Sequence, residues 1–239
     1  MDYKSDKTSE MFSSHDDPLE VWAILFRRQI SSGTLPEFFL EGLSHTPLNE
    51  GVYPSVNIVQ PFMQSVGWKA VEIDTLLSFA QLCNFFYDKT FPLPKVIRDK
   101  NNLEYTKVPD IFSRCFSQLP LLFYEDYRKV LIEFGRLHQI PTADKEQFSL
   151  WLQRQYWYSV EKGILIEGGA VQPVGVQLID SIAERTHCMD PQTHKIYGMH
   201  PVIRTPIVSE TYPPVYYTFE NYGQIKRSLL DFERMYKNA

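Results

Sequence analysis

The chain of 239 residues lacks several features that would assign it to a broad class. No stretch approaches the roughly 18 consecutive apolar residues that a transmembrane helix requires, so we expect no membrane span. Lysine and arginine together number 24 against 29 aspartates and glutamates, and the net charge of -5 argues against an electrostatic nucleic-acid binder. The three cysteines, Cys83, Cys115 and Cys188, are far apart, so we expect no disulfide framework and predict a cytoplasmic location.

Common catalytic and metal-binding motifs are also missing. There is no glycine-rich phosphate-binding loop, no serine nucleophile elbow and no evident cysteine–histidine pair. His187, Cys188, His194 and His200 lie close together in the sequence, but their spacing fits no common zinc pattern. We interpret this stretch as a polar loop rather than a metal site.

Residues 1–17 are polar and charged and contain no apolar segment, which predicts a disordered lead-in without a secretory signal. Residues 18–239 are sufficient for a single domain, and the 44% hydrophobic content of the chain indicates a substantial core. The spacing of apolar residues predicts a mainly α domain with a few short β-strands. The predicted helices cover residues 19–30, 36–43, 54–66, 76–87, a short stretch around 113–118, 126–137, 145–162, 178–183 and 221–237. The predicted strands cover residues 71–73, 171–176, 199–210 and 212–219.

Residues 109–120 (PDIFSRCFSQLP) and residues 156–161 (YWYSVE) resemble the metal-binding segments of the pterin-dependent aromatic amino acid hydroxylases, which are non-haem iron monooxygenases. The first is residues 109–120, PDIFSRCFSQLP, against a family pattern of P-D-[IV]-[CF]-H-[DE]-x-x-G-H-x-P. The second is residues 156–161, YWYSVE, whose glutamate in the family completes a facial triad with the two histidines of the first segment. Here Ser113 and Gln118 stand at the histidine positions, while Glu161 remains.

The resemblance extends over about residues 18–236, which corresponds to the catalytic domain of the short bacterial phenylalanine hydroxylases. Further family segments follow one another in order and with matching spacing. They are Trp22 with Arg28-Gln29, residues 39–43 (FLEGL), Gly67-Trp68, Phe91-Pro92 with Ile97-Arg98, the segment that begins at Gly175, and residues 216–220. The resemblance therefore implies the aromatic amino acid hydroxylase catalytic-domain fold.

By the same resemblance, five residues are candidates for substrate binding. Arg98 stands where the family binds the substrate carboxylate, a role that suits the planar donor fork of a guanidinium; the alternative is a surface salt bridge. Thr106 and Asp110 match positions that help to hold the amino-acid backbone or Arg98 itself. Trp157 matches a tryptophan beside the substrate ring, with core packing as the alternative, and Gln177 replaces a family glycine.

The changes at the metal-ligand positions alter what the site is expected to bind. An Fe(II) site of this kind needs two imidazoles and a carboxylate on one face, and Ser113 and Gln118 are weak neutral donors by comparison. Arg114, on the former pterin side, replaces an acidic residue and places a positive charge beside the vacated site. We therefore predict no metal, and neither iron nor tetrahydropterin as a cofactor.

Two carboxylates are the candidates for catalysis. Glu161 is retained and Asp180 replaces a family serine, so both are expected in one partly desolvated pocket, where their pKa values can separate. The hypothesis is that Glu161 is a general base with Asp180 or Arg114 as its partner. The alternative is a salt-bridged remnant without chemistry. Lys162 either faces solvent or pairs with Glu161.

The resulting prediction is a diverged homologue of the aromatic amino acid hydroxylases. It binds an aromatic amino acid or a related carboxylate and transforms it by metal-independent acid–base chemistry in a biosynthetic pathway. One alternative is an inactive pseudoenzyme that acts as a binding or scaffold subunit beside a partner enzyme. Another is a monooxygenase with an altered metal site of Glu161, Asp180 and water. The predicted partner is a small carboxylate-bearing ligand, with neither nucleic acid nor membrane.

Overall fold

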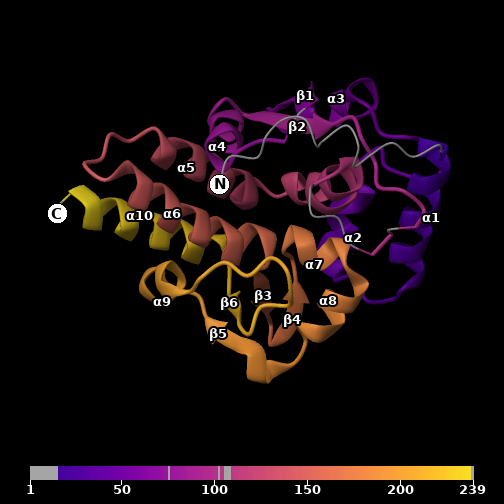
Figure 1. Ribbon diagram of the computed structural model, residues 1–239. Helices are drawn as coiled ribbons and strands as arrows, with labels where there is room; N and C mark the ends of the chain where they lie inside the picture. The colour runs from indigo at the N-terminus through magenta and orange to yellow at the C-terminus, as the bar shows by residue number, and fades with distance from the viewer. Residues whose placement is uncertain (1–15, 75, 102, 105–108, 238–239) are drawn as a thin grey trace.

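A computed structural model describes residues 16–74, 76–101, 103–104 and 109–237 of the chain. Helices dominate it, as expected, and the strands are short (Figure 1). The α-helices are α1 (Pro18–Ser31), α2 (Glu37–Ser44), α3 (Val56–Ser65), α4 (Phe79–Tyr87), α5 (Glu125–His138), α6 (Lys145–Tyr156), α7 (Val176–Asp180), α8 (Ile182–His187), α9 (Met199–Arg204) and α10 (Tyr222–Lys237). Shorter helical segments are the π-helical η2 (Ser113–Gln118) and η4 (Trp157–Glu161) and the 3₁₀-helical η3 (Leu119–Phe123) and η5 (Pro191–Thr193).

The strands form two small sheets. In one, β1 (Lys69–Ile73) and β2 (Thr90–Pro94) pair in parallel. The other has the order β4-β3-β6-β5 and consists of β3 (Ile164–Glu167), β4 (Ala170–Pro173), β5 (His194–Ile196) and β6 (Tyr216–Phe219). β3 runs antiparallel to β4 and parallel to β6, and β5 is parallel to β6. In Figure 1 the two sheets lie at opposite edges of the molecule, with α6 and α10 between them.

The start of α4 shows how local chemistry sets a helix boundary. The helix predicted over residues 76–87 begins only at Phe79, because Ser78 and Gln81 form a reciprocal capping box. The amide of Gln81 donates to Ser78 Oγ at 3.3 Å, and the amide of Ser78 donates to Gln81 Oε1 at 2.9 Å. The cap fixes the point at which the chain turns into the helix.

The strand predicted over residues 199–210 is wrong. The structure has helix α9 there, with Val202 and Ile203 buried and Pro201 in its first turn, where proline's missing N–H costs no hydrogen bond. A short apolar run fits alternation and helical spacing equally well, and tertiary packing decided between them. The strand predicted over 212–219 is confirmed only for β6.

Most of the predicted lead-in, residues 1–15, lies outside the described part of the chain. At its end, Asp17 accepts a hydrogen bond from the amide of Leu19 at 3.0 Å and caps α1, and Asp16 accepts one from the amide of Lys100 at 3.0 Å. The three cysteines are free and buried. No described helix combines the length and apolar character needed to cross a bilayer.

Gly135 marks the close approach of α5 to α4. A methyl group at this position would lie 2.5 Å from the amide nitrogen of Tyr87 and 2.7 Å from the carbonyl oxygen of Cys83. Because these are backbone atoms, G135A should force the helices apart and lower the free energy of unfolding by about 1–3 kcal/mol in urea denaturation. Gly51→Ala is the control, since its methyl group would meet only Asn49 Oδ1 at 3.4 Å. If the two substitutions have equal effects, α4 and α5 can separate enough to accept a methyl group without lowering the free energy of unfolding.

Candidate functional site

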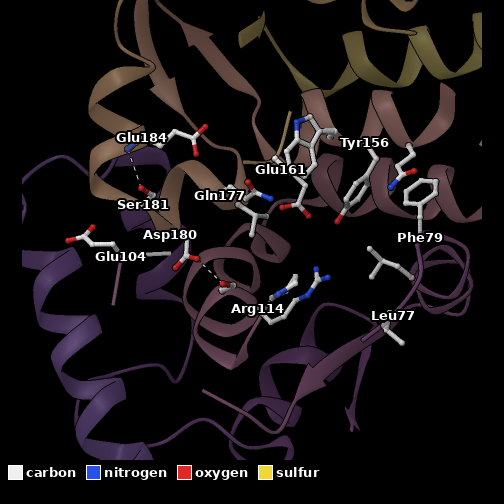
Figure 2. A pocket seen from close by; sticks show the side chains of 17 residues that line it. Leu77, Phe79, Glu104, Arg114, Tyr156, Glu161, Gln177, Asp180, Ser181 and Glu184 are labelled. Carbon is white, nitrogen blue, oxygen red and sulfur yellow. Dashed lines mark hydrogen bonds between the residues drawn. The ribbon is translucent and has the colours of Figure 1, made fainter. Parts of the chain in front are cut away.

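A cavity of about 250 Å³ opens beside η2, η4 and α7 (Figure 2). Its volume is near the lower end of the range for small-molecule sites, roughly 300–1,000 Å³. Its apolar lining residues include Leu77, Phe79, Leu82 and Trp157. Polar side chains that line the cavity include Ser113, Arg114, Tyr156, Glu161, Gln177 and Asp180.

Two π-helical segments and the start of α7 place these side chains. π-helical turns are rare in proteins overall, and many of those that occur lie at functional sites. In η4 the wider turn is visible in the hydrogen bond from the amide of Lys162 to the carbonyl of Trp157, at 2.9 Å and five residues apart. The backbone before α7 packs directly on this segment, because a methyl group on Gly175 would lie 2.5 Å from the carbonyl oxygen of Glu161. Close backbone packing, rather than a loop, therefore holds Glu161 in place.

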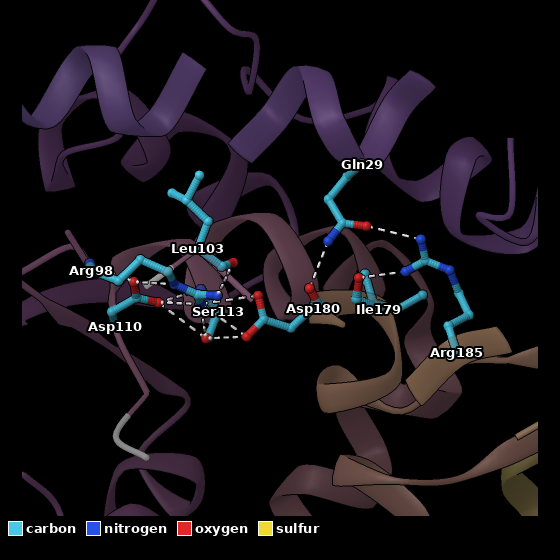
Figure 3. Close-up of polar contacts among 8 residues, drawn as sticks. All are labelled: Gln29, Arg98, Leu103, Asp110, Ser113, Ile179, Asp180 and Arg185. Carbon is cyan, nitrogen blue, oxygen red and sulfur yellow. Dashed lines mark hydrogen bonds and ion pairs between the residues drawn. The ribbon is translucent and has the colours of Figure 1, made fainter. Parts of the chain in front are cut away.

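Arg98 is enclosed by two carboxylates (Figure 3). Its Nε and Nη2 donate to the two oxygens of Asp110, both at 2.9 Å, in a bidentate pair. Nη2 also lies 3.0 and 2.9 Å from the oxygens of Asp180 and 2.9 Å from Ser113 Oγ, which itself lies 2.8 Å from Asp180. The Arg98 side chain is 1% exposed, so a surface salt bridge, the alternative considered for it, is wrong.

The charges in this network are not equivalent. Burial opposes ionisation of Asp110, but the guanidinium of Arg98 and the amides of Ser113 and Arg98 outweigh it and hold the pKa of Asp110 below its usual value. For Asp180, burial raises the pKa, Arg98 offsets only part of the increase, and the charge of Asp110 adds to it. Both carboxylates raise the pKa of Arg98 against the effect of burial. Asp180 is therefore the carboxylate of the network that takes up a proton more readily.

The end of α7 is fixed by a second set of polar contacts (Figure 3). The helix predicted over residues 178–183 is divided into α7 and α8 at Ser181, whose backbone is extended. Gln29 in α1 donates through Nε2 to the carbonyl oxygen of Asp180 at 2.6 Å. Its Oε1 accepts a hydrogen bond from Nη2 of the buried Arg185 at 2.9 Å. These contacts tie the backbone that carries the Asp180 carboxylate to the first helix.

Arg114 points into the cavity although its residue is only 7% exposed (Figure 2). Its Nη1 donates to Gln118 Oε1 at 2.5 Å, and Gln118 Nε2 donates to the hydroxyl of Tyr127 at 3.2 Å. Within the described residues, no carboxylate oxygen comes within the 4.0 Å of Arg114 that would make an ion pair. The buried guanidinium thus has a neutral amide as its hydrogen-bonded neighbour.

Glu161 projects toward the same space from η4 and is 8% exposed (Figure 2). Burial raises its pKa above the usual value, and the charges of Arg114 and Lys162 and the polar groups of Tyr156 and Gln177 offset only part of that effect. The hydroxyl of Tyr156 is close enough to favour the Glu161 anion, yet it forms no hydrogen bond of normal geometry in the described part of the chain. The cavity therefore presents a carboxylate that holds a proton at higher pH than an exposed glutamate does.

Lys162 neither faces solvent nor forms an ion pair with Glu161. It forms an ion pair with Glu184, in which the two side chains are 3% and 6% exposed. The hydroxyl of Tyr216 also donates to Glu184 Oε1, at 3.0 Å, and Lys162 Nζ lies 5.4 Å from the centre of the Trp157 ring. This pair supports the wall of the cavity behind Trp157, a contact that its position beside Glu161 did not reveal.

The donors at the positions that the resemblance assigns to iron binding fit Fe(II) poorly. The hydroxyl of Ser113 is bonded within the Arg98 network, and the amide oxygen of Gln118 is occupied by a guanidinium, which leaves Glu161 as the one strong ligand of the three. In the described ranges, no three His, Cys, Asp or Glu side chains are grouped so that they could hold a metal ion. In the histidine-containing stretch, His194 Nε2 instead contacts the carbonyl of Cys188 at 2.7 Å.

Most predicted site residues meet in one place. Those that line the cavity are Ser113, Arg114, Trp157, Glu161, Gln177 and Asp180. Arg98, Asp110 and Gln118 are not among the lining residues but bond to them, and Thr106 lies outside the described residues. The sequence interpretation missed Tyr156, whose place five residues before Glu161 matches one turn of a π-helix; nothing in the sequence marked that turn as π-helical.

Comparisons with known proteins agree with this architecture. The sequence profile of the family described as "Biopterin-dependent aromatic amino acid hydroxylase" matches residues 38–239. Phenylalanine-4-hydroxylase of Chromobacterium violaceum is 24% identical over 236 residues, which span 94% of this chain and 76% of that protein. The structure of phenylalanine hydroxylase from Legionella pneumophila matches with a TM-score of 0.82 at 26% identity, over 91% of this chain and 96% of that one.

A structure of the Chromobacterium violaceum enzyme with bound iron(III) and the oxidised cofactor 7,8-dihydrobiopterin has the same fold. It matches with a TM-score of 0.83 at 21% identity, over 100% of this chain and 90% of that one. The chain therefore belongs to the biopterin-dependent aromatic amino acid hydroxylase family.

Proposed function

We propose that this family member binds an aromatic amino acid or a related aromatic carboxylate and transforms it by acid–base chemistry that needs neither iron nor tetrahydropterin. We place this reaction in a cytoplasmic biosynthetic pathway. The observation that carries the proposal is the buried carboxylate of Glu161, whose raised pKa and position in the cavity suit proton transfer. The aromatic lining residues Phe79 and Trp157 suit an aromatic ring.

In this reaction Glu161 accepts a proton from the carbon next to a carbonyl group of the ligand. A base is most effective when its pKa approaches the working pH, and burial moves Glu161 in that direction. The guanidinium of Arg114 stabilises the negative charge that develops on the ligand. Asp180, the other candidate catalytic carboxylate, lines the cavity and is held by Arg98 and Ser113.

Deuterium exchange into phenylpyruvate tests this proposal. The protein, treated with a chelator, is incubated with phenylpyruvate in D₂O, and incorporation at the benzylic carbon is followed by NMR. Wild type should accelerate the exchange over buffer, and Glu161→Gln should lower the protein-dependent rate by roughly 10²–10⁴-fold. Exchange that survives the substitution would refute Glu161 as the base, and exchange that requires added iron would refute metal independence.

If the E161Q variant has little activity, the pH dependence of its stability shows whether it is folded. The same measurement shows whether the pKa of Glu161 is raised in the folded wild type. Because the folded-state pKa of Glu161 is raised, the folded state binds the proton more tightly, and wild type loses stability as the pH rises between the unfolded and folded pKa values. Glu161→Gln lacks this loss. Its free energy of unfolding should therefore match that of wild type at low pH and exceed it above the folded pKa.

A non-catalytic binding subunit is the second candidate. It is favoured by one observation: Asp180, the other candidate catalytic group, has its carboxylate engaged with Arg98 and Ser113 rather than free in the cavity. This candidate predicts that phenylpyruvate binds, as measured by calorimetry, and that no exchange above the buffer rate occurs.

A further inference from the structure

We infer that Arg114, and not Arg98, is the residue that holds the anionic group of the ligand. The inference rests on the proposed function and specifies how the cavity recognises a carboxylate. It depends on three features: the state of Arg98, the surroundings of Arg114 and the groups that face Arg114 across the cavity.

Arg98 is already paired with two carboxylates of the chain. Asp110 takes Nε and Nη2 in a bidentate pair, and Asp180 places both of its oxygens within 3.0 Å of Nη2. Two carboxylates more than neutralise one guanidinium, so a third anion at this point would be repelled. Arg98 is also absent from the residues that line the cavity. The carboxylate of Asp180 thus occupies the place of an external anion from within the chain.

Arg114 is in the opposite situation. It lines the cavity, it is 7% exposed, and its hydrogen bond to Gln118 uses one of its five donor hydrogens. No carboxylate of residues 16–74, 76–101, 103–104 or 109–237 lies within 4.0 Å of it. A buried cation without a contacting counter-ion is costly, and an anion bound in the cavity would remove that cost.

The groups around Arg114 define the rest of the ligand. Glu161 projects toward the same space and accepts hydrogen bonds, so it suits a proton donor on the ligand (Figure 2). Tyr156 contributes a buried hydroxyl that has no partner of normal geometry in the described residues. The lining by Phe79 and Leu77 is apolar. The cavity therefore fits a compact aromatic molecule with an anionic group directed at Arg114 and a polar hydrogen directed at Glu161.

Calorimetric titration with two matched probes tests the assignment. The probes are 3-phenylpropanoate and 2-phenylethylamine, which share a phenyl ring and a two-carbon chain but carry opposite charges. Arg114→Gln should weaken binding of 3-phenylpropanoate by roughly 10- to 100-fold, because a charge-assisted hydrogen bond is lost, without weakening 2-phenylethylamine. Arg114→Lys keeps the charge but not the donor fork and should weaken the acid by about tenfold. It also provides the test if Arg114→Gln does not fold.

Arg27→Gln is the control for the change in net charge, since Arg27 is exposed and pairs with Glu50 at the surface. It should leave the affinity for 3-phenylpropanoate unchanged. If wild type binds the acid and both Arg114 variants bind it equally well, the assignment to Arg114 is wrong and the proposed function stands. If wild type binds neither probe, the proposed function itself fails, and the assignment fails with it.

Discussion

Replacing Arg98 with methionine should lower the free energy of unfolding by about 3–5 kcal/mol, the usual cost of removing one partner from a buried ion pair. Methionine approximates the volume of the arginine stem but leaves Asp110 and Asp180 without their cation. Both carboxylates lie in the interior, at 0% and 13% side-chain exposure, so water cannot replace the guanidinium fully. The measurement is urea denaturation at pH 7, with the slope of the transition compared between variants.

Arg27→Met is the matched control for this substitution. Arg27 and Glu50 pair at 3.3 Å with side chains that are 63% and 55% exposed, and such surface pairs contribute roughly 0–1 kcal/mol. If R98M and R27M destabilise the protein to the same small extent, the Arg98 network is not a structural element. In that case Arg98 would be available to bind a ligand, as the family resemblance implies.

The fold could be predicted from the sequence because its helices depend on residues that are close together in the chain and because the family segments occur in the expected order. The helix predicted over residues 19–30 follows from apolar residues at helical spacing, and the structure has α1 there, with Asp17 as its cap. The ordered family segments then fixed the architecture that the structure confirms. The helix at residues 199–204 was not predicted, because so short a segment with few apolar residues does not distinguish a helix from a strand.

The partners of the site residues were harder to predict, because they depend on contacts between distant segments. Arg98 and Asp180 are 82 positions apart in the chain. Their residue types are consistent with the predicted roles, substrate binding for Arg98 and catalysis for Asp180, and do not indicate that the two side chains form an ion pair. The structure shows that they bind each other. The carboxylate at position 180 therefore sets the environment of Arg98, and no inspection of Arg98 alone could reveal this.

Contacts between site residues also affect the residues at the expected metal site. Arg114 bonds to Gln118, and Ser113 bonds to Asp180, so each residue that the resemblance places at an iron-histidine position has a polar partner within the site. The four residues form two hydrogen-bonded pairs. Histidines at positions 113 and 118 alone would leave Arg114 without its amide partner and next to the metal.

Rebuilding the iron site is therefore expected to require more than the two imidazoles. Ser113→His with Gln118→His supplies the missing ligands to Glu161 and should raise Fe(II) affinity by at least about 100-fold, since even groups that only orient a ligand contribute roughly 10–100-fold. Adding Arg114→Asp should raise it further, because this change replaces a cation beside the metal with an anion. Anaerobic Fe(II) titration and metal analysis after desalting measure both steps.

Glu161→Gln in the rebuilt protein is the control, and it should abolish the gain because the triad then loses its carboxylate. Stoichiometric iron in the natural protein would contradict the metal-independent function proposed above. If the triple variant binds no more iron than the natural protein does, the frame around η2 and η4 has itself moved from the geometry of a metal site. If it binds iron tightly, the backbone around η2 and η4 keeps the geometry that a metal site requires.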